Sequence, residues 1–216
     1  MTPLNFIQKI VLACKGKQKE ISIVFGIVLA VFLTQQSSFS RVCGQIRQDT
    51  LRLHIRAASD SKADQEDKLA VRDAILEQAE MIFQEQNTRE QAEVSAQKNL
   101  DKIQQIAENT LESRGSSNTA SVYLTDMFFD TIEYENFTMP AGEYRALRVD
   151  IGKAEGKNWW CVLFPPLCVP SAQQVQQTTA YSQQEKNVLE SKFEIRFALV
   201  ELWQQLFSKQ PTYDGC

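Results

Sequence analysis

The stretch LRLHIRAASDSKADQEDKLAVRDAILE, residues 51–77, decides the fold class, because its periodicity changes from that of a strand to that of a helix. It opens with LRLHIRA, in which apolar and polar side chains alternate strictly, as in a half-buried β-strand. Ser59, Asp60 and Ser61 interrupt the alternation and supply oxygens that cap helices. Apolar residues at helical spacing follow, so we expect a strand and then a helix that ends at about Phe83.

Three further segments continue this mixture of strand and helix patterns. The spacing of apolar residues predicts a second helix from about Glu90 to Ser113, ended by Gly115 at its C′ position. Residues 121–129 and 144–151 carry the apolar and alternating patterns of strands. The sum is one α+β domain, with an antiparallel or mixed sheet of about four strands and two helices packed on one of its faces.

The C-terminal quarter is less regular. Residues 171–190 are rich in Gln, Thr and Ser, which favours a polar linker or exposed loop. Residues 193–199 fit both a strand and a helix, and we expect a strand to about Leu199 with a short helix over 201–207. The predicted organisation is therefore a signal or anchor over 1–40, a main α+β domain over 41–170, the linker over 171–190, and a strand and helix over 191–216 that complete the domain.

The N-terminal segment has the composition of a secretory signal. Ile21–Leu33 is apolar and uncharged, and four lysines precede it. It is shorter than the roughly 20 residues of a membrane-spanning helix. Ser38-Phe39-Ser40 offers small residues at the positions that a signal peptidase reads. We expect export of the main domain, with the segment either cleaved off or retained as an anchor, rather than a buried core element.

The charge distribution excludes one class of function. The formal net charge is −4, and four lysines against one glutamate lie before Gln35, so the rest of the chain carries −7. A nucleic-acid-binding domain needs clustered lysines and arginines that displace counterions from phosphates. We therefore expect no nucleic-acid partner.

No residue pattern indicates a cofactor, a metal or a catalytic group. His54 is the only histidine and alternates with Arg52 and Arg56, whose charges lower its pKa, so an ordinary histidine is favoured over a general base. Asp60 and Asp64 belong to a helix start, where acidic side chains are expected from the helix dipole. We expect no bound cofactor and no metal site.

The stretch NWWCVLFPPLC, residues 158–168, concentrates unusual residues. Pro165 and Pro166 force a bend between Cys161 and Cys168, so these two cysteines either form a disulfide or stay reduced as buried apolar residues. Trp159 and Trp160 are neighbours, and on a strand their rings point to opposite faces. Either one ring contributes to a binding surface or both cover the end of the sheet.

Three segments resemble the stage II sporulation protein R family. These are residues 51–77, then MPAGEYRALRVDIGKAEGKNWWCVLFPPLC at 139–168, and FEIRFALVELWQ at 193–204. The resemblance implies a signalling protein of endospore-forming bacteria that is exported from the forespore into the space between the two membranes. There it would activate a membrane-embedded aspartic protease, which cleaves the precursor of the sporulation sigma-E factor in the mother cell. The protein itself would not be an enzyme.

The family motifs and the residue patterns together give a candidate surface for binding the protease. It combines one polar strand face, a helix start, two helix residues and the segment with the tryptophan pair: His54, Arg56, Asp60, Asp64, Arg72, Asp73, Asn158, Trp159 and Trp160. Arg72 and Asp73 suit a salt-bridged scaffold equally well. The alternative function is an exported cell-wall or envelope hydrolase, for which His54, Asp60 and Cys161 are the candidate residues, and a structural envelope protein is a third reading.

Overall fold

The computed structural model describes residues 18–83, 86–167 and 175–191, together with Phe197, Ala198, Val200 and Leu202. The chain divides into two compact units, Met1–Arg41 and Val42–Cys216. Each unit is described by itself.

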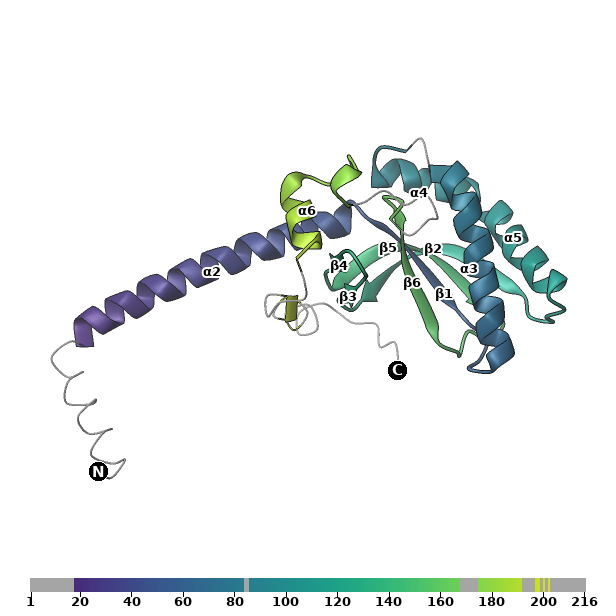
Figure 1. Cartoon of the computed structure of the whole chain (residues 1–216), viewed down its shortest axis with the longest axis horizontal. Coiled ribbons are helices and arrows are strands. Elements are labelled where there is room, and N and C mark those ends of the chain that lie inside the picture. Colours follow the sequence, from purple (N-terminus) through teal and green to yellow (C-terminus); the bar gives the residue numbers. More distant parts are fainter. Residues whose placement is uncertain are drawn as a thin grey trace, which may run out of the picture. The chain divides into compact units, whose positions relative to one another are not determined.

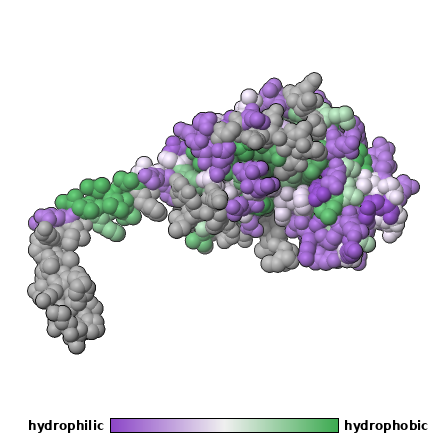
Figure 2. All heavy atoms as spheres, in the orientation of Figure 1, coloured by the Kyte–Doolittle hydropathy of each residue, from purple (hydrophilic) through white to green (hydrophobic). Residues whose placement is uncertain are grey.

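The first unit contains most of a long helix, α2, which spans Gln18–Gln48. The side chains of Ile23, Phe25 and Val28 are 62%, 67% and 61% exposed. Figure 2 shows this stretch as a band of hydrophobic atoms. The 27 residues of Ser22–Gln48 are long and apolar enough to cross a membrane, and a signal sequence has the same properties. Exposure of these side chains contradicts the alternative of a buried core element.

A four-stranded sheet forms the centre of the second unit (Figure 1). Its strands are β1 (Leu51–Arg56), β2 (Ala120–Phe129), β5 (Gly142–Ile151) and β6 (Asn158–Phe164), in the order β2-β5-β1-β6. β1 is parallel to β5, whereas the other two pairs are antiparallel. The sheet is therefore mixed, which confirms the predicted α+β class. Two short strands, β3 (Ile132–Glu133) and β4 (Thr138–Met139), pair separately.

Three helices pack on one face of this sheet, where two were expected (Figure 1). They are α3 (Lys62–Phe83), α4 (Arg89–Lys98) and α5 (Leu100–Ser113). The predicted second helix is interrupted at Asn99, whose side-chain amide donates to the Ser95 carbonyl oxygen at 2.8 Å. Asparagine competes in this way with the helical backbone, so one long amphipathic pattern becomes two helices.

The opposite face of the sheet is also covered, which the alternating pattern of β1 did not predict. A second core cluster there joins Ile46 near the end of α2, Tyr144 and Val162 of the sheet, and Leu189. As a result Arg52 is fully buried and His54 is only 2% exposed. The prediction of a half-buried strand is therefore wrong, because a layer of short elements far along the chain packs on its polar face.

Part of that layer comes from the segment that we expected to be a polar linker. Val175–Gln177 forms a 3₁₀ turn and Gln183–Leu189 forms helix α6. Ser182 and Glu185 make a complete capping box at its start. Val175 and Tyr181 are buried in the second cluster. The linker expectation is thus wrong for the described part of the segment, since a few apolar residues among many glutamines suffice to anchor it.

The structure describes only part of the segments that carry two further expectations, the C-terminal strand and helix and the Cys161–Cys168 disulfide. Phe197, Ala198, Val200 and Leu202 are helical, so a strand is wrong at Phe197 and Ala198. The rest of 191–216, apart from Ser191, lies outside the described residues. Cys168 does so as well, and the Cys161–Cys168 disulfide stays a prediction.

Candidate functional site

The strand registers bring two of the candidates, His54 and Trp160, into one row with Arg148 and Tyr123 across the sheet face opposite α3, α4 and α5. His54 pairs with Arg148 on β5 and with Trp160 on β6, and Arg148 pairs in turn with Tyr123 on β2. Paired residues of neighbouring strands project to the same face. A second row lies beside the first and contains Ser121, Asp150, Arg56 and Asn158. We refer to Tyr123, Arg148, His54, Trp160, Asp150, Arg56 and Asn158 as the sheet-face patch.

His54 lies at the centre of the patch and is held on two sides. Its ring stacks on Trp160, with the centroids 4.2 Å apart and an interplanar angle of 15°. Its Nε2 is 2.8 Å from Oδ1 of Asn158, an arrangement in which Nε2–H donates to the amide oxygen. Burial lowers its pKa to about 4, and the positive charges of Arg148 and Arg56 act in the same direction. His54 is therefore neutral at physiological pH.

Asp150 organises the neighbouring part of the patch. Arg148 Nε donates to its Oδ1 at 2.9 Å, and the hydroxyl of Tyr123 donates to its Oδ2 at 2.7 Å. The Tyr123 side chain is 38% exposed. In the same row Arg56 Nε donates to the Gly156 carbonyl oxygen at 3.3 Å. The patch thus presents aromatic rings beside fixed charges, a combination that is enriched at the centres of protein interfaces.

The two tryptophans point to opposite faces of the sheet, as strand geometry predicts. Trp160 lies in the sheet-face patch, where its ring makes an edge contact with Phe129 at 4.9 Å. Trp159 pairs with Ile55 and packs against the core beneath the helices. The Arg72 guanidinium lies 4.3 Å from the centroid of the Trp159 ring. The two rings therefore belong to different environments, Trp159 to the helix side and Trp160 to the patch.

The other candidates do not join the patch. Arg72 forms an ion pair with Asp73 at 2.7 Å on α3, on the helix side of the sheet. Asp60 Oδ1 accepts from the Lys157 backbone N–H at 2.8 Å. Asp64 accepts from the Ser59 hydroxyl and the Asn118 amide, and these hydrogen bonds lower its pKa. Asp60 and Asp64 fix the loop between β1 and α3 against the rest of the domain.

The residues of the alternative hydrolase do not form one site. Cys161 pairs with Leu53, and both lie in the core under the helices. His54 is on the opposite face of the sheet, so its ring and the Cys161 thiol cannot act on one substrate. Asp60 is held in the loop before α3. Among the described residues no group of three His, Cys, Asp or Glu side chains is arranged to bind a metal ion.

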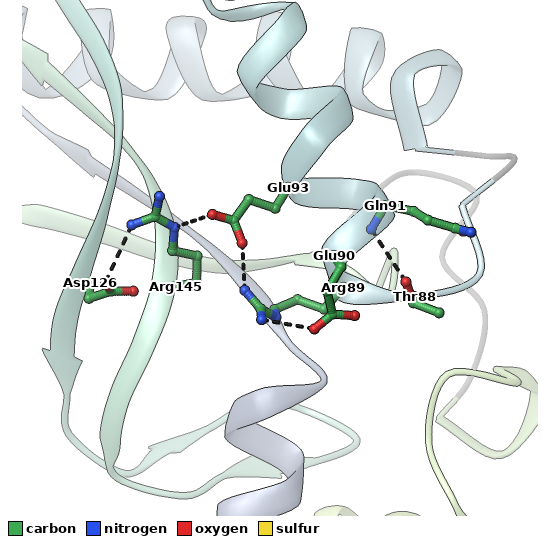
Figure 3. A network of polar contacts seen from close by, with 7 residues as sticks. All are labelled: Thr88, Arg89, Glu90, Gln91, Glu93, Asp126 and Arg145. Atoms are coloured by element: carbon green, nitrogen blue, oxygen red, sulfur yellow. Dashed lines mark hydrogen bonds and ion pairs between the residues drawn. The ribbon is translucent and has the colours of Figure 1, made fainter.

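A second polar cluster was missed by the sequence analysis (Figure 3). Glu93 on α4 accepts from Arg89 Nη1 at 2.6 Å and from Arg145 Nε at 2.7 Å. Arg89 also pairs with Glu90 at 2.8 Å, and Arg145 with Asp126 at 3.4 Å. The i,i+4 spacing of Arg89 and Glu93 is visible in the sequence. The contribution of Arg145 is not, because it comes from a strand far along the chain.

Two comparisons with known proteins found a match, one with a protein family and one with a curated protein. The sequence model of "Stage II sporulation protein R (spore_II_R)" matches residues 47–174, which include all four strands of the sheet and the helices α3, α4 and α5. The stage II sporulation protein R of Bacillus subtilis (strain 168) is 39% identical over 123 residues. That alignment covers 57% of this chain and 55% of the relative, so the chain spans about half the length of the curated relative that it matches. No solved structure matches the chain. Since the family match extends over more than half of the sequence, the chain belongs to the stage II sporulation protein R family.

Proposed function

We propose that the second unit acts outside the membrane as a signalling domain, which binds a membrane-embedded aspartic protease and activates it. The activated protease would cleave the sigma-E precursor and so start transcription in the mother cell. Membership of the stage II sporulation protein R family supports the place of this protein in sporulation. The protease and the precursor are part of our proposal.

The observation that carries a binding role is the construction of the sheet-face patch. Its only histidine is buried, neutral and hydrogen-bonded to an amide rather than to a carboxylate. A general base needs a pKa near the working pH and access to a substrate proton, and His54 has neither. The same patch offers the partly exposed Trp160 ring beside Arg56 and the Arg148–Asp150 pair, groups that suit recognition of a protein surface.

Activation by binding sets a thermodynamic requirement. A ligand shifts a receptor between two states only by the difference in its affinity for them, so the patch must bind the active form of the protease more tightly than the inactive form. A tenfold change in the ratio of active to inactive receptor needs a difference of about 1.4 kcal/mol in binding free energy. One or two buried aromatic or arginine contacts are enough to supply that difference.

The proposed location follows from α2. Its length and apolar composition suit a signal sequence or a membrane anchor. Four lysines before the apolar stretch would keep the N-terminus in the cytosol of the forespore, and the second unit would then lie in the intermembrane space. In this arrangement the patch faces a compartment that is accessible to a receptor in the opposite membrane.

The test is sigma-factor processing in sporulating cells that carry single substitutions. Trp160→Ala and Arg56→Gln change the sheet-face patch, and we expect each to reduce processing at least fivefold. Arg72→Gln and Asp73→Asn change the helix side and serve as controls of matched polarity, for which we expect near-normal processing. Immunoblots of the exported protein show whether each variant accumulates.

Two results would contradict this assignment. If cells with Trp160→Ala or Arg56→Gln process the sigma factor normally at normal levels of the variant protein, the binding surface lies elsewhere. If Arg72→Gln and Asp73→Asn are the defective pair instead, the helix side and Trp159 form the contact. His54→Gln separates binding from catalysis, because an enzyme that used His54 would lose all activity while a binding domain would lose little beyond stability.

A further inference from the structure

A hollow of about 400 Å³ lies in the second unit where β5 begins. It is lined by residues from the end of α2, the start of α4 and the strands β2 and β5: Gly44, Arg47, Gln48, Arg89, Asp126, Glu143, Tyr144 and Arg145. Three of these side chains are guanidinium groups. The hollow is separate from the sheet-face patch and shares no residue with it.

Arg47 is the least neutralised of the three arginines. Its Nη1 donates to the Ala141 carbonyl oxygen at 3.1 Å, which fixes the side chain. Gly142 makes room for it, because a Cβ there would lie 2.5 Å from Arg47 Cδ. Among the described residues no carboxylate lies within 4.0 Å of this guanidinium. Its remaining N–H groups are therefore available to a ligand, in a fixed geometry that suits a carboxylate.

Arg89 and Arg145, in contrast to Arg47, are already paired with carboxylates. They share the carboxylate of Glu93, with N–O distances of 2.6 and 2.7 Å, and Arg89 also pairs with Glu90 at 2.8 Å (Figure 3). The second partner of Arg145, Asp126, is 3.4 Å away and its side chain is 60% exposed. Arg89 Nε is buried and has no hydrogen-bond partner among the described residues. Two of the three arginines that line the hollow are thus held by carboxylates, and Arg47 is not.

The charges at the hollow restrict what it can bind. Arg47, Arg89 and Arg145 line the hollow together with Asp126 and Glu143, and two further carboxylates, Glu90 and Glu93, pair with these arginines. A site with this balance gives no general attraction for a polyphosphate or a nucleic acid. Glu143 is exposed, and no ion pair joins it to a described cation. Among the described residues, Arg47 therefore has no carboxylate partner and Glu143 has no cationic partner.

From this pattern we propose that the hollow binds a protein segment in which an acidic side chain stands next to a basic one. Arg47 donates two hydrogen bonds to the acidic carboxylate, and Glu143 accepts from the neighbouring Lys or Arg. The inference rests on the proposed function in one respect: the protein that supplies the segment is the protease receptor. Binding of the segment itself does not depend on that function.

The direct test uses the full chain in lipid nanodiscs and short peptides observed by saturation-transfer NMR. The probes are N-acetyl-Gly-Glu-Lys-Gly-amide, the same peptide with Gln in place of Glu, and the same peptide with Gln in place of Lys. We expect the Glu-Lys peptide to bind at least fivefold more tightly than either of the others. Equal affinity for the three peptides would overturn the proposal.

Two variants assign the contacts. Arg47→Gln should weaken binding of the Glu-Lys peptide at least fivefold, whereas Arg41→Gln, an exposed arginine on the same helix, should not change it. Glu143→Gln lies on the exposed rim and leaves the fold intact. It should abolish the preference for Lys while it preserves the preference for Glu. Unchanged binding by Arg47→Gln, or competition by inorganic phosphate at lower concentration than by the Glu-Lys peptide, would contradict the assignment.

Processing of the sigma factor in cells separates this inference from the proposed function. Loss of peptide binding together with reduced processing in Arg47→Gln supports the receptor as the partner. Loss of peptide binding with normal processing overturns the receptor as the partner and leaves the role of the sheet-face patch to the Trp160→Ala test.

Discussion

At the residue scale, the least predictable feature is the burial of charge on β1. Arg52 is fully buried, and its guanidinium lies 4.3 Å from the ring centroid of Phe129 and 5.1 Å from that of Tyr144. Its Nε donates to the Cys161 carbonyl oxygen at 3.1 Å and its Nη2 to the Tyr134 hydroxyl at 3.0 Å. Aromatic faces and neutral acceptors here replace the carboxylate that usually accompanies a buried arginine.

Substitution of Arg52 tests this arrangement. Arg52→Ala leaves a cavity and two unpaired acceptors, so we expect it to lower the free energy of unfolding by about 3 kcal/mol. Arg52→Met fills most of the volume without burying a charge, and should stay within about 1.5 kcal/mol of the wild type. Urea unfolding measures both. A loss for the Met variant as large as that for the Ala variant would show that the guanidinium and its contacts, rather than the filled volume, stabilise the core.

His54 makes the free energy of unfolding depend on pH. Burial, together with the charges of Arg148 and Arg56, lowers its folded pKa to about 4, whereas unfolded histidine titrates near pH 6.5. The unfolded chain therefore binds the proton first. The stability that neutral His54 provides is complete above pH 6.5 and is lost as the pH falls toward 4, by roughly 3 kcal/mol. In His54→Gln the loss of unfolding free energy between pH 7 and 4 should be smaller by that amount.

Asp49, which follows α2, gives the free energy of unfolding a pH dependence of the opposite sign to that of His54. Burial and the neighbouring Glu185 carboxylate raise its pKa to about 6, above the value of about 3.9 for an unfolded aspartate. Stability from protonated Asp49 is present below pH 4 and is lost as the pH rises through 6. After allowance for screening at this half-buried position, we expect a change of roughly 1–2 kcal/mol. Asp49→Asn should remove this decline, and an unchanged pH profile would contradict the assignment.

At the element scale, the sequence predicted what local patterns encode. The alternation in 144–151 and the capped helix after Ser61 both appear where expected, because each depends on neighbours a few residues away. The break at Asn99 and the packing of α6 were not predicted. The first depends on one side-chain hydrogen bond, and the second on a sheet face formed by distant residues.

The candidate site was predicted in a similarly uneven way. Sequence motifs identified His54, Arg56, Asn158 and Trp160, which the structure brings together. Arg148, Asp150 and Tyr123 were not singled out, although they complete the same rows. These rows follow only from the pairing register of all four strands, and no local sequence pattern predicts that register.

The loop between β5 and β6 gives a prediction at this scale. Gly156 N–H donates to the Ala57 carbonyl oxygen at 2.9 Å, and a Cβ at Gly156 would overlap the backbone of Ser59. Gly156→Ala should therefore separate the two loops that position Asn158, and we expect a loss of at least roughly 2 kcal/mol in unfolding free energy. Gly115→Ala is the control. Its Cβ meets open space at a φ of +74°, so only the backbone cost of roughly 1 kcal/mol remains. Equal losses in thermal melts would contradict this account.

At the scale of the whole molecule, both core clusters are made of residues of the second unit. Cys43 and Ile46 are fully buried, whereas the described apolar side chains over residues 23–31 of the first unit, such as Phe25 at 67%, are exposed; Phe39, at 6%, is a buried residue of the first unit. A chain that begins at Val42 should fold with an unfolding free energy within about 1 kcal/mol of the full-length value, since it keeps every buried side chain of the second unit. A chain that begins at Thr50 loses Cys43 and Ile46 and should be less stable by several kcal/mol. Circular dichroism melts compare the two, and equal stability would show that the end of α2 is dispensable.

The central proposal is that this domain switches on a protease by binding it. The most direct measurement is cleavage of the sigma-E precursor by the aspartic protease reconstituted in lipid vesicles, with this protein added from the extracytoplasmic side. We predict that cleavage begins on addition of the wild-type protein, saturates with its concentration, and falls at least fivefold with Trp160→Ala. Cleavage at the same rate with no added protein, or no cleavage at saturating protein, would contradict the claim.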